Sequence, residues 1–284
     1  MILITGAAGK TGQAIIRALL NRKQKIRALV HKELQIQPIQ NLGVQEVLVG
    51  DITSQKIIGK ALKGIKKIYY ICPNVSPDEF KIGKMLIQAA KSASVEHFVY
   101  HSVFHPHIES MPHHWQKMRV EEYLFQSGLA YTILQPAPYM QNILAHWDDI
   151  VNKSRYPIPY SETTRLNMVD LEDIAEAAAT VISEPGHEGA IYELCGAENL
   201  SQIEVAQILS QQLGHRIDVK FIPIQEWEAN AQKKGLGDYQ VKTLIKMFQY
   251  YDRVGFLGNC RVLEWLLQRP PSSFTAFLKR VMLG

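Results

Sequence analysis

The first half of the chain alternates between short, continuous apolar runs and longer segments in which apolar residues recur every three or four positions. Apolar runs that stop at glycine, proline or aspartate are typical of buried strands, and the spaced pattern is typical of helices with one buried face. The pattern predicts strands at residues 1–4, 25–30, 46–49, 67–72, 98–100 and 131–134. It predicts helices near residues 10–22, 54–63, 79–93 and 114–127.

Strands that alternate with helices at this pace indicate successive βαβ units and therefore a parallel sheet. The predicted fold class is α/β, with a doubly wound parallel sheet of the Rossmann type. Because βαβ crossovers are right-handed, a ligand is expected at the carboxyl ends of the strands. Between the second and third strands Pro38 breaks the pattern, so only a short helical or irregular stretch is expected there.

The regular alternation of strands and helices ends near residue 150, and Pro157 and Pro159 predict a loop beyond it. Asp170 with Asp173, and later Ser201, have the side chains and positions of helix N-caps. The other predicted strands are residues 165–169, 191–194 and 218–222, and the other helices are residues 171–183, 202–213, 239–251 and 273–282. We predict a Rossmann-type domain at residues 1–150 and a smaller mixed α/β region at residues 151–284 that packs on it and covers the ligand.

Composition and charge narrow the class of protein. The chain has 46% apolar and 20% charged residues, which is ordinary for a globular protein. A net charge of +4, without any block of five basic residues, does not indicate nucleic-acid binding. No apolar run approaches the ~20 residues that a membrane span needs, and the strand that begins at residue 2 leaves no room for a signal peptide. We therefore expect a cytoplasmic protein with no membrane or nucleic-acid partner.

The first candidate site is the segment Gly6-Ala-Ala-Gly9-Lys10-Thr11-Gly12, which joins the first strand to the first helix. Glycines there permit a sharp turn and the close approach of a ligand, while the first helical N–H groups attract an anion. This order of strand, turn and helix favours a dinucleotide pyrophosphate. The phosphate loop of nucleotide hydrolases is excluded because its first glycine is replaced by Ile4. A purely structural turn stays open as the alternative.

Several further motifs follow the predicted strands in order along the chain: Gly50-Asp51 after the third strand, Pro73-Asn74 after the fourth and Gln135-Pro136 after the sixth. Others are the segments at residues 42–44, 169–175 and 263–270. With the glycine turn, these motifs resemble the NmrA-like family of atypical short-chain dehydrogenase/reductases over nearly the whole length. The resemblance implies a Rossmann fold and a turn that holds NADP. Family members include NADPH-dependent reductases and redox-sensing regulators with little or no activity.

The end of the second strand bears on the choice of dinucleotide. NAD sites usually have a carboxylate there, whereas this strand ends at Val30-His31-Lys32, with no acid before Glu33. A 2′-phosphate favours cations, so Lys32 and Lys10 are the candidates from charge and NADP(H) is the predicted cofactor. The resemblance adds His31, which we assign to the 2′-phosphate together with Lys32. The resembled family usually has Arg in place of His31, which leaves NAD(H) open. That both side chains are merely solvated also stays open.

Other residues are assigned to the cofactor through the resemblance. Asp51 matches the family's adenine contact, although it can equally be the N-cap of the helix that follows. Pro73 is expected to line the nicotinamide ribose and Lys117 to bond it. The neighbouring residues assigned to the same site are Ile52, Cys72 and Pro136.

The catalytic motif of ordinary short-chain dehydrogenases is missing. None of the twelve tyrosines has a lysine four residues later, although that lysine is what lowers the tyrosine pKa. The chain instead has His113-x-x-x-Lys117, a pattern that several NmrA-like members share. His113 has three open roles: proton donor, contact to substrate or ring, and structural helix start. Ser102, which follows the fifth strand, either bonds a substrate carbonyl or caps the turn.

Six of the ten histidines lie between residues 97 and 114. His105, His107 and Glu109 match no established metal spacing, and the three cysteines form no C-x-x-C pair, so no metal site is predicted. Loop histidines are expected to face solvent or substrate.

An apolar wall for the acceptor is predicted from Trp115, Tyr139 and Met140, with Asn142 closing the nicotinamide pocket by resemblance. Aromatic walls suit flat, conjugated acceptors such as quinones, dyes and aryl carbonyls. The alternative is that these are core residues, which is the better interpretation for Trp147.

Two functions follow from these residues. The leading hypothesis is an NAD(P)H-dependent oxidoreductase, namely an NADPH-dependent reductase of a small conjugated acceptor. The alternative is an NADP(H)-sensing regulator with a protein partner and little catalytic activity, which the missing tyrosine favours. Epimerase or dehydratase chemistry on a nucleotide sugar is disfavoured because those relatives need that tyrosine. The sequence indicates neither the acceptor nor the oligomeric state.

Overall fold

The computed structural model describes residues 1–283, which form two compact units. Unit 1 comprises Met1–His107, His113–Pro136 and Leu171–Glu193. Unit 2 comprises Ile108–Pro112, Ala137–Asp170 and the residues from Leu194 onward. The domain boundary near residue 150 stays a prediction. Within residues 1–283, no helix combines the length and hydropathy needed to span a bilayer.

A seven-stranded sheet is the centre of unit 1, in the order β3-β2-β1-β4-β5-β6-β9. Neighbouring strands from β3 through β6 pair in parallel. The order reverses between β1 and β4, which is where doubly wound sheets bind ligands. The predicted Rossmann fold is therefore confirmed. The strands are β1 (Ile2–Ile4), β2 (Ile26–Val30), β3 (Glu46–Val49), β4 (Lys67–Tyr70), β5 (His97–His101), β6 (Tyr131–Pro136) and β9 (Ala190–Leu194).

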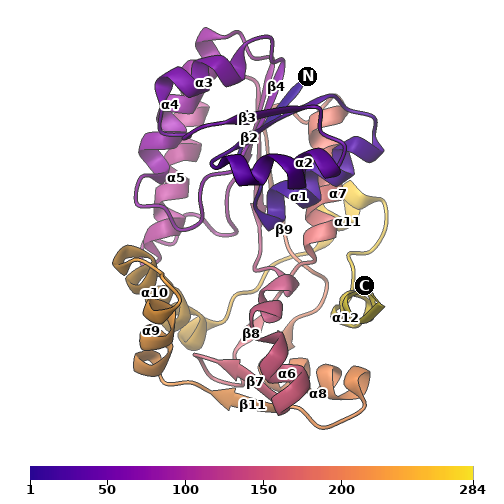
Figure 1. Cartoon of the computed structure of the whole chain (residues 1–284). Coiled ribbons are helices and arrows are strands. Elements are labelled where there is room, and N and C mark those ends of the chain that lie inside the picture. Colours follow the sequence, from indigo (N-terminus) through magenta and orange to yellow (C-terminus); the bar gives the residue numbers. More distant parts are fainter. Residues whose placement is uncertain (284) are drawn as a thin grey trace. The chain divides into compact units, whose positions relative to one another are not determined.

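Helices cover both faces of this sheet (Figure 1). One face carries α1 (Lys10–Asn21), α2 (Ile36–Asn41) and α7 (Leu171–Ser183). The other carries α3 (Gln55–Leu62), α4 (Glu79–Ser92) and α5 (Pro112–Phe125). A short 3₁₀ helix, η1 (Glu33–Gln35), precedes α2. Each predicted helix of the first half is present, because apolar residues at helical spacing bury one face against the sheet.

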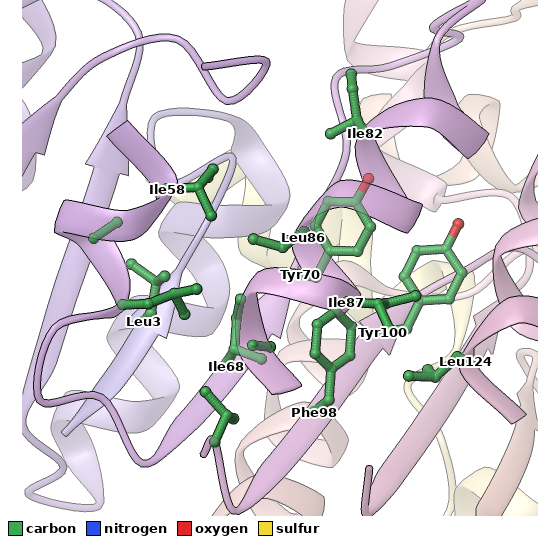
Figure 2. Close-up of a cluster of buried hydrophobic side chains, with 14 of the residues drawn as sticks. Leu3, Ile58, Ile68, Tyr70, Ile82, Leu86, Ile87, Phe98, Tyr100 and Leu124 are labelled. Atoms are coloured by element: carbon green, nitrogen blue, oxygen red, sulfur yellow. The ribbon is translucent and has the colours of Figure 1, made fainter. Parts of the chain in front are cut away.

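The core beneath α4 and α5 is rich in aromatic rings (Figure 2). Tyr70 of β4 and Tyr100 of β5 are stacked with ring centres 5.3 Å apart, and Phe98 meets Tyr70 edge-on at 6.0 Å. Leu86 from α4 and Leu124 from α5 complete the cluster, and all five side chains are buried. The two tyrosine hydroxyls point in the same direction (Figure 2). This places two polar groups inside an otherwise apolar layer.

Unit 2 contains two small sheets. In one, β7 (Arg155–Ile158) pairs in parallel with β11 (Asp218–Phe221), and in the other β8 (Arg165–Leu166) pairs antiparallel with β10 (Leu200–Ser201). The helices of this unit are η2 (Met140–His146), α6 (Trp147–Lys153), α8 (Gln202–Leu213), α9 (Ile224–Lys233), α10 (Asp238–Val254), α11 (Arg261–Leu267) and α12 (Phe274–Leu283). The N-cap prediction for Ser201 is confirmed, because its side chain accepts a hydrogen bond from the Glu204 N–H.

The short helical stretch expected around Pro38 is present as η1 and α2, whereas the loop expected at Pro157 was wrong. Pro38 lies in the first turn of α2, where an N–H group has no helical partner to lose. Pro157 lies within strand β7 and not in a loop. Every strand of a two-stranded sheet is an edge strand, and an edge tolerates the missing N–H of proline. Both prolines therefore lie where a missing N–H group costs no hydrogen bond, and the helix or strand continues through each of them.

Candidate cofactor site and active site

The turn between β1 and α1 has no room for side chains on its inner side. The Gly9 N–H donates to the Gly6 carbonyl over 3.0 Å, and Gly6 itself has a φ of +60°. A Cβ on Gly12 would lie 2.4 Å from the Gly6 carbonyl oxygen and 2.8 Å from the Cα of Ala7. Both are backbone atoms, so any larger residue at position 12 would distort the turn.

The amino end of α1 is suited to an anion. Its first turn carries no acidic residue, and Gly9 at the N-cap provides no capping side chain. Gly9 and Lys10 are exposed and Thr11 is partly exposed. Because the first N–H groups of a helix carry partial positive charge, they can bind the pyrophosphate of a dinucleotide. The residues present therefore fit the predicted cofactor.

Thr5 fixes this turn to the neighbouring strand. Its hydroxyl donates to the Ile71 carbonyl over 2.9 Å and accepts from the Ile71 N–H over 2.8 Å. A Cβ on Gly6 would lie 3.1 Å from the Ile71 Cβ, so the two segments are in close contact. Cys72 and Pro73 follow directly, which places them beside the glycine turn at the reversal point of the sheet.

The two candidates for a 2′-phosphate lie directly after β2, and both are exposed. The backbone N–H groups of His31 and Lys32 both donate to Oε1 of Gln35, each over 3.0 Å. Gln35 therefore occupies these two N–H groups and leaves the two side chains for a ligand. Their contact with a 2′-phosphate stays a prediction.

Asp51 makes a local turn after β3. Its Oδ1 accepts the Thr53 N–H over 2.8 Å, and this hydrogen bond lowers the Asp51 pKa. The N-cap of α3 is Ser54, so Asp51 is not the cap of that helix. Asp51 is exposed and Ile52 partly exposed, and the adenine contact stays a prediction for both.

Lys117 of α5 forms an ion pair that the sequence did not indicate. Its Nζ lies 3.0 Å from Oε1 of Glu79, the first residue of α4, and donates to the His101 carbonyl over 3.3 Å. Glu79 is only 3% exposed and also accepts from the Tyr100 hydroxyl over 2.8 Å. Cys72 is buried beside this carboxylate, and its thiol pKa is raised by burial and by Glu79.

His113 is the second residue of the same helix and is held neutral. Burial and the nearby Lys117 lower its pKa to about 4. A neutral imidazole is a poor proton donor at pH 7, so the electrostatics of the site oppose the proton-donor role. Its other two roles stay predictions.

Ser102 contacts a second buried carboxylate. Its hydroxyl donates to Oε1 of Glu121, which lies one turn after Lys117 on α5. The Gln135 amide donates to both oxygens of Glu121, over 3.1 and 2.9 Å. Burial raises the Glu121 pKa to about 7, against the opposing effects of Ser102 and Gln135. Ser102 is therefore not a simple turn cap: it is bonded to a carboxyl group that titrates near neutral pH.

The histidine cluster does not form one site. His97 is bonded to Thr132 at 2.8 Å, and His101 to the Tyr69 hydroxyl at 2.7 Å. Burial lowers the His101 pKa to about 3. The expectation of solvent- or substrate-facing histidines is wrong for His114, which is buried and whose Nδ1 lies 3.2 Å from the His105 carbonyl. Within residues 1–283, no three His, Cys, Asp or Glu side chains are grouped to hold a metal ion.

The residues of the predicted substrate wall are divided between the two units. Trp115 is in unit 1 and is 39% exposed, while Pro136 at the end of β6 is buried. Tyr139 and Asn142 are in unit 2, where the Asn142 N–H donates to the Tyr139 carbonyl over 3.0 Å at the start of η2. Their contact with a substrate stays a prediction.

Neither buried carboxylate was predicted from the sequence. Glu79 occupies the first turn of a helix, where an acid normally complements the helix dipole, so its pattern did not distinguish it. Glu121 offered a signal: it lies four residues after Lys117, and residues at that spacing share a helix face.

A doubly wound parallel sheet with a tight glycine turn at its reversal point defines a Rossmann-fold protein of the dinucleotide-binding class. Within that class, the chain belongs to the NmrA-like family, whose model matches residues 1–275.

Known relatives and structures support this placement. The chain is 31% identical to an NAD(P)H azoreductase of Xenophilus azovorans, over 98% of this chain and 97% of the relative. The crystal structure of an NADPH-dependent quinone oxidoreductase from Escherichia coli, complexed with NADPH, is similar with a TM-score of 0.86. It is 25% identical, and the match covers 99% of this chain and all of the other. A triphenylmethane reductase of Citrobacter sp. complexed with NADP(H), 22% identical, shares the fold with a TM-score of 0.85 over 99% of both chains.

Proposed function

We propose that this protein is an NADPH-dependent reductase of small conjugated acceptors, such as quinones and azo dyes. The observation that carries the proposal is the glycine turn at the reversal point of the sheet, where no Cβ can be accommodated at Gly12. Membership of the NmrA-like family supports it, as does 31% identity to an NAD(P)H azoreductase along nearly the whole chain.

The cofactor assignments follow from that turn. Gly6, Gly9 and Gly12, with Lys10 and Thr11, hold the pyrophosphate at the amino end of α1. His31 and Lys32 hold the 2′-phosphate, since both are exposed after β2 and no acid precedes Glu33. The relative that was crystallised with NADPH supports this choice of dinucleotide.

Bound NADPH supplies a hydride to the acceptor, and the protein supplies position and charge. Lys117 bonds the nicotinamide ribose, and Pro73 restricts the backbone beside it. Trp115, Tyr139 and Asn142 face the acceptor, and His113 contacts it as a neutral ring. The enzyme works without the Tyr-x-x-x-Lys tyrosine of ordinary short-chain dehydrogenases.

The test is oxidation of NADPH, followed at the nicotinamide absorbance, with menadione, methyl red and aryl carbonyls as acceptors. We expect turnover with at least one quinone or azo acceptor, and weaker binding of NADH than of NADPH. Gly12→Ala should abolish both binding and turnover, whereas Gly59→Ala should change neither, because a Cβ at Gly59 meets no atom within 4 Å.

A specific observation favours a second function. The chain lacks the usual tyrosine, and the histidine in its place is neutral at pH 7. If NADPH binds tightly but no acceptor is reduced, the protein is an NADP(H)-sensing regulator and the reductase proposal fails. If NADPH does not bind, both functions fail.

A further inference from the structure

The hydroxyl of Ser102, the carboxyl of Glu121 and the amide of Gln135 form one buried hydrogen-bonded group. They come from three elements: the segment after β5, helix α5 and the end of β6. All three residues are buried, and Glu121 is only 2% exposed. Burying a carboxyl group is costly unless it is hydrogen-bonded, and here its two oxygens receive three bonds.

This group lies beside Lys117. Ser102 directly follows His101, whose carbonyl accepts from the Lys117 Nζ over 3.3 Å. Glu121 lies one helical turn after Lys117, and the lysine charge lowers the Glu121 pKa. Ser102 is the first residue after the carboxyl end of β5. Rossmann sheets bind their ligands at the carboxyl ends of their strands.

The proposed reaction needs a proton as well as a hydride. When a hydride adds to a quinone or an azo group, the product carries a negative charge until a proton joins it. His113 is neutral at pH 7, and no tyrosine precedes a lysine by four residues. Neither of these groups therefore supplies the proton, which leaves solvent or another acid of the site.

We propose that Ser102 and Glu121 form a proton-delivery pair, in which the Ser102 hydroxyl protonates the reduced acceptor and the Glu121 carboxyl replaces the proton on Ser102. The inference rests on the proposed reductase function. Ser102 is the residue that touches the acceptor. Glu121 acts through Ser102 and also positions it.

The step balances in atoms and charge. The acceptor gains a hydride from the reduced nicotinamide and one proton from the Ser102 oxygen. The bond in which Ser102 donates to Glu121 belongs to the ionised carboxylate, and in the protonated state the Glu121 O–H donates to the Ser102 oxygen instead. From that state the O–H bond of Ser102 breaks as a new one forms with the Glu121 proton, so Glu121 ends as a carboxylate. Solvent returns that proton between turnovers. Because Ser102 is buried, its proton is replaced from its hydrogen-bond partner and not directly from bulk water.

Two charged groups of opposite sign shift the pKa of Glu121 in opposite directions. Lys117, on its own helix, favours the carboxylate, and Glu193, on β9, favours the acid. Burial is the largest effect and also favours the acid. Reduction by this route requires the protonated carboxyl, so turnover should fall as the pH rises through about 7.

The experiment compares two acceptors, of which one needs a proton with the hydride and the other does not. Menadione needs a hydride and a proton, whereas malachite green, a triarylmethyl cation, becomes neutral on receiving a hydride alone. We expect Glu121→Gln and Ser102→Ala each to lower menadione turnover by about 10²- to 10⁴-fold, the usual contribution of a positioned acid. In both variants the loss of malachite green turnover should be at least tenfold smaller than the loss of menadione turnover, because hydride transfer to the cation needs no proton. The matched control is Glu122→Gln, which removes an exposed carboxylate from the same helix and should change neither.

The pH profile and a direct titration complete the test. Wild-type menadione turnover should fall above about pH 7, and that fall should disappear in Glu121→Gln. In the cofactor-free protein, an infrared carboxyl band should titrate near pH 7 in the wild type and be missing in Glu121→Gln.

The outcomes separate this inference from the function on which it rests. If wild type reduces neither acceptor, the reductase proposal fails. If wild type is active but both variants lose the two activities equally, or lose neither, the proton-delivery pair is refuted. If a variant does not fold, the wild-type band decides, and a midpoint below pH 5 overturns the inference.

Discussion

Replacing Lys117 by methionine should destabilise the protein, whatever the lysine does in catalysis. The substitution removes the ammonium group that lies 3.0 Å from Glu79 and leaves a carboxylate that is 3% exposed, with the Tyr100 hydroxyl and the Cys72 thiol as neutral hydrogen-bond donors. Breaking a buried ion pair from one side costs about 3–5 kcal/mol, because the other charge stays buried and unpaired. At roughly 2–4 °C per kcal/mol for chains of comparable size, the melting temperature should fall by about 10 °C.

The opposite substitution should cost less. In Glu79→Gln, Lys117 keeps its bond to the His101 carbonyl, and its side chain is 15% exposed, so water can solvate part of the charge. In the double variant no charge is left unpaired. We therefore expect the double variant to be about 2 kcal/mol more stable than Lys117→Met alone, a coupling within the range measured for contacting residues.

The assay is urea denaturation of the four cofactor-free proteins, read as a double-mutant cycle. Additive effects of the two substitutions, or a Lys117→Met variant as stable as the wild type, would refute the reasoning. The result also decides how catalytic tests are read. Lost activity in Lys117→Met alone mixes lost function with lost stability, whereas lost activity in the stable double variant reports on the lysine itself.

Three further predictions concern other parts of the site. Gly12→Ala should raise the dissociation constant of NADPH at least 100-fold by calorimetry, because its Cβ would lie 2.4 Å from the Gly6 carbonyl oxygen; Gly59→Ala should leave it unchanged. His31→Arg should tighten NADPH binding several-fold and leave NADH binding unchanged, since arginine keeps its charge at every accessible pH; equal gains for both nucleotides would contradict the 2′-phosphate assignment. The stability of wild type relative to Glu121→Gln should fall as the pH rises from about 4.5 to about 7, because burial raises the folded-state pKa and the unfolded chain releases its proton first; a flat difference in denaturation midpoint across that range would contradict it.

The fold was largely predictable from the sequence because its determinants are local. Each strand from β1 to β6 is an apolar run, and each helix between them repeats apolar positions at helical spacing. The glycine turn was predictable for the same reason, since one segment contains all its parts. Pro157 misled because the effect of proline depends on whether its N–H would have had a partner, which the pairing of the strands decides.

The partners of the site residues were not predictable, because they are set by contacts distant in sequence. Lys117 was found through its motif, but Glu79 lies 38 residues away and meets it only after α4 and α5 pack side by side on the sheet. Ser102 and Gln135 were both noticed as residues at strand ends, yet their bonds to Glu121 depend on the register of β5 against β6.

Burial has opposite consequences for the two candidate proton donors of this site. Removing water disfavours the charged form of any group, so it lowers the pKa of a histidine and raises that of a carboxyl. Here burial lowers the pKa of His113 to about 4 and raises the pKa of Glu121 to about 7. Lys117 lowers both values, and for Glu121 burial outweighs it. Burial therefore disables the histidine as an acid and favours the protonated glutamate, so that under the proposed proton-delivery pair the absence of the usual tyrosine is compatible with reduction.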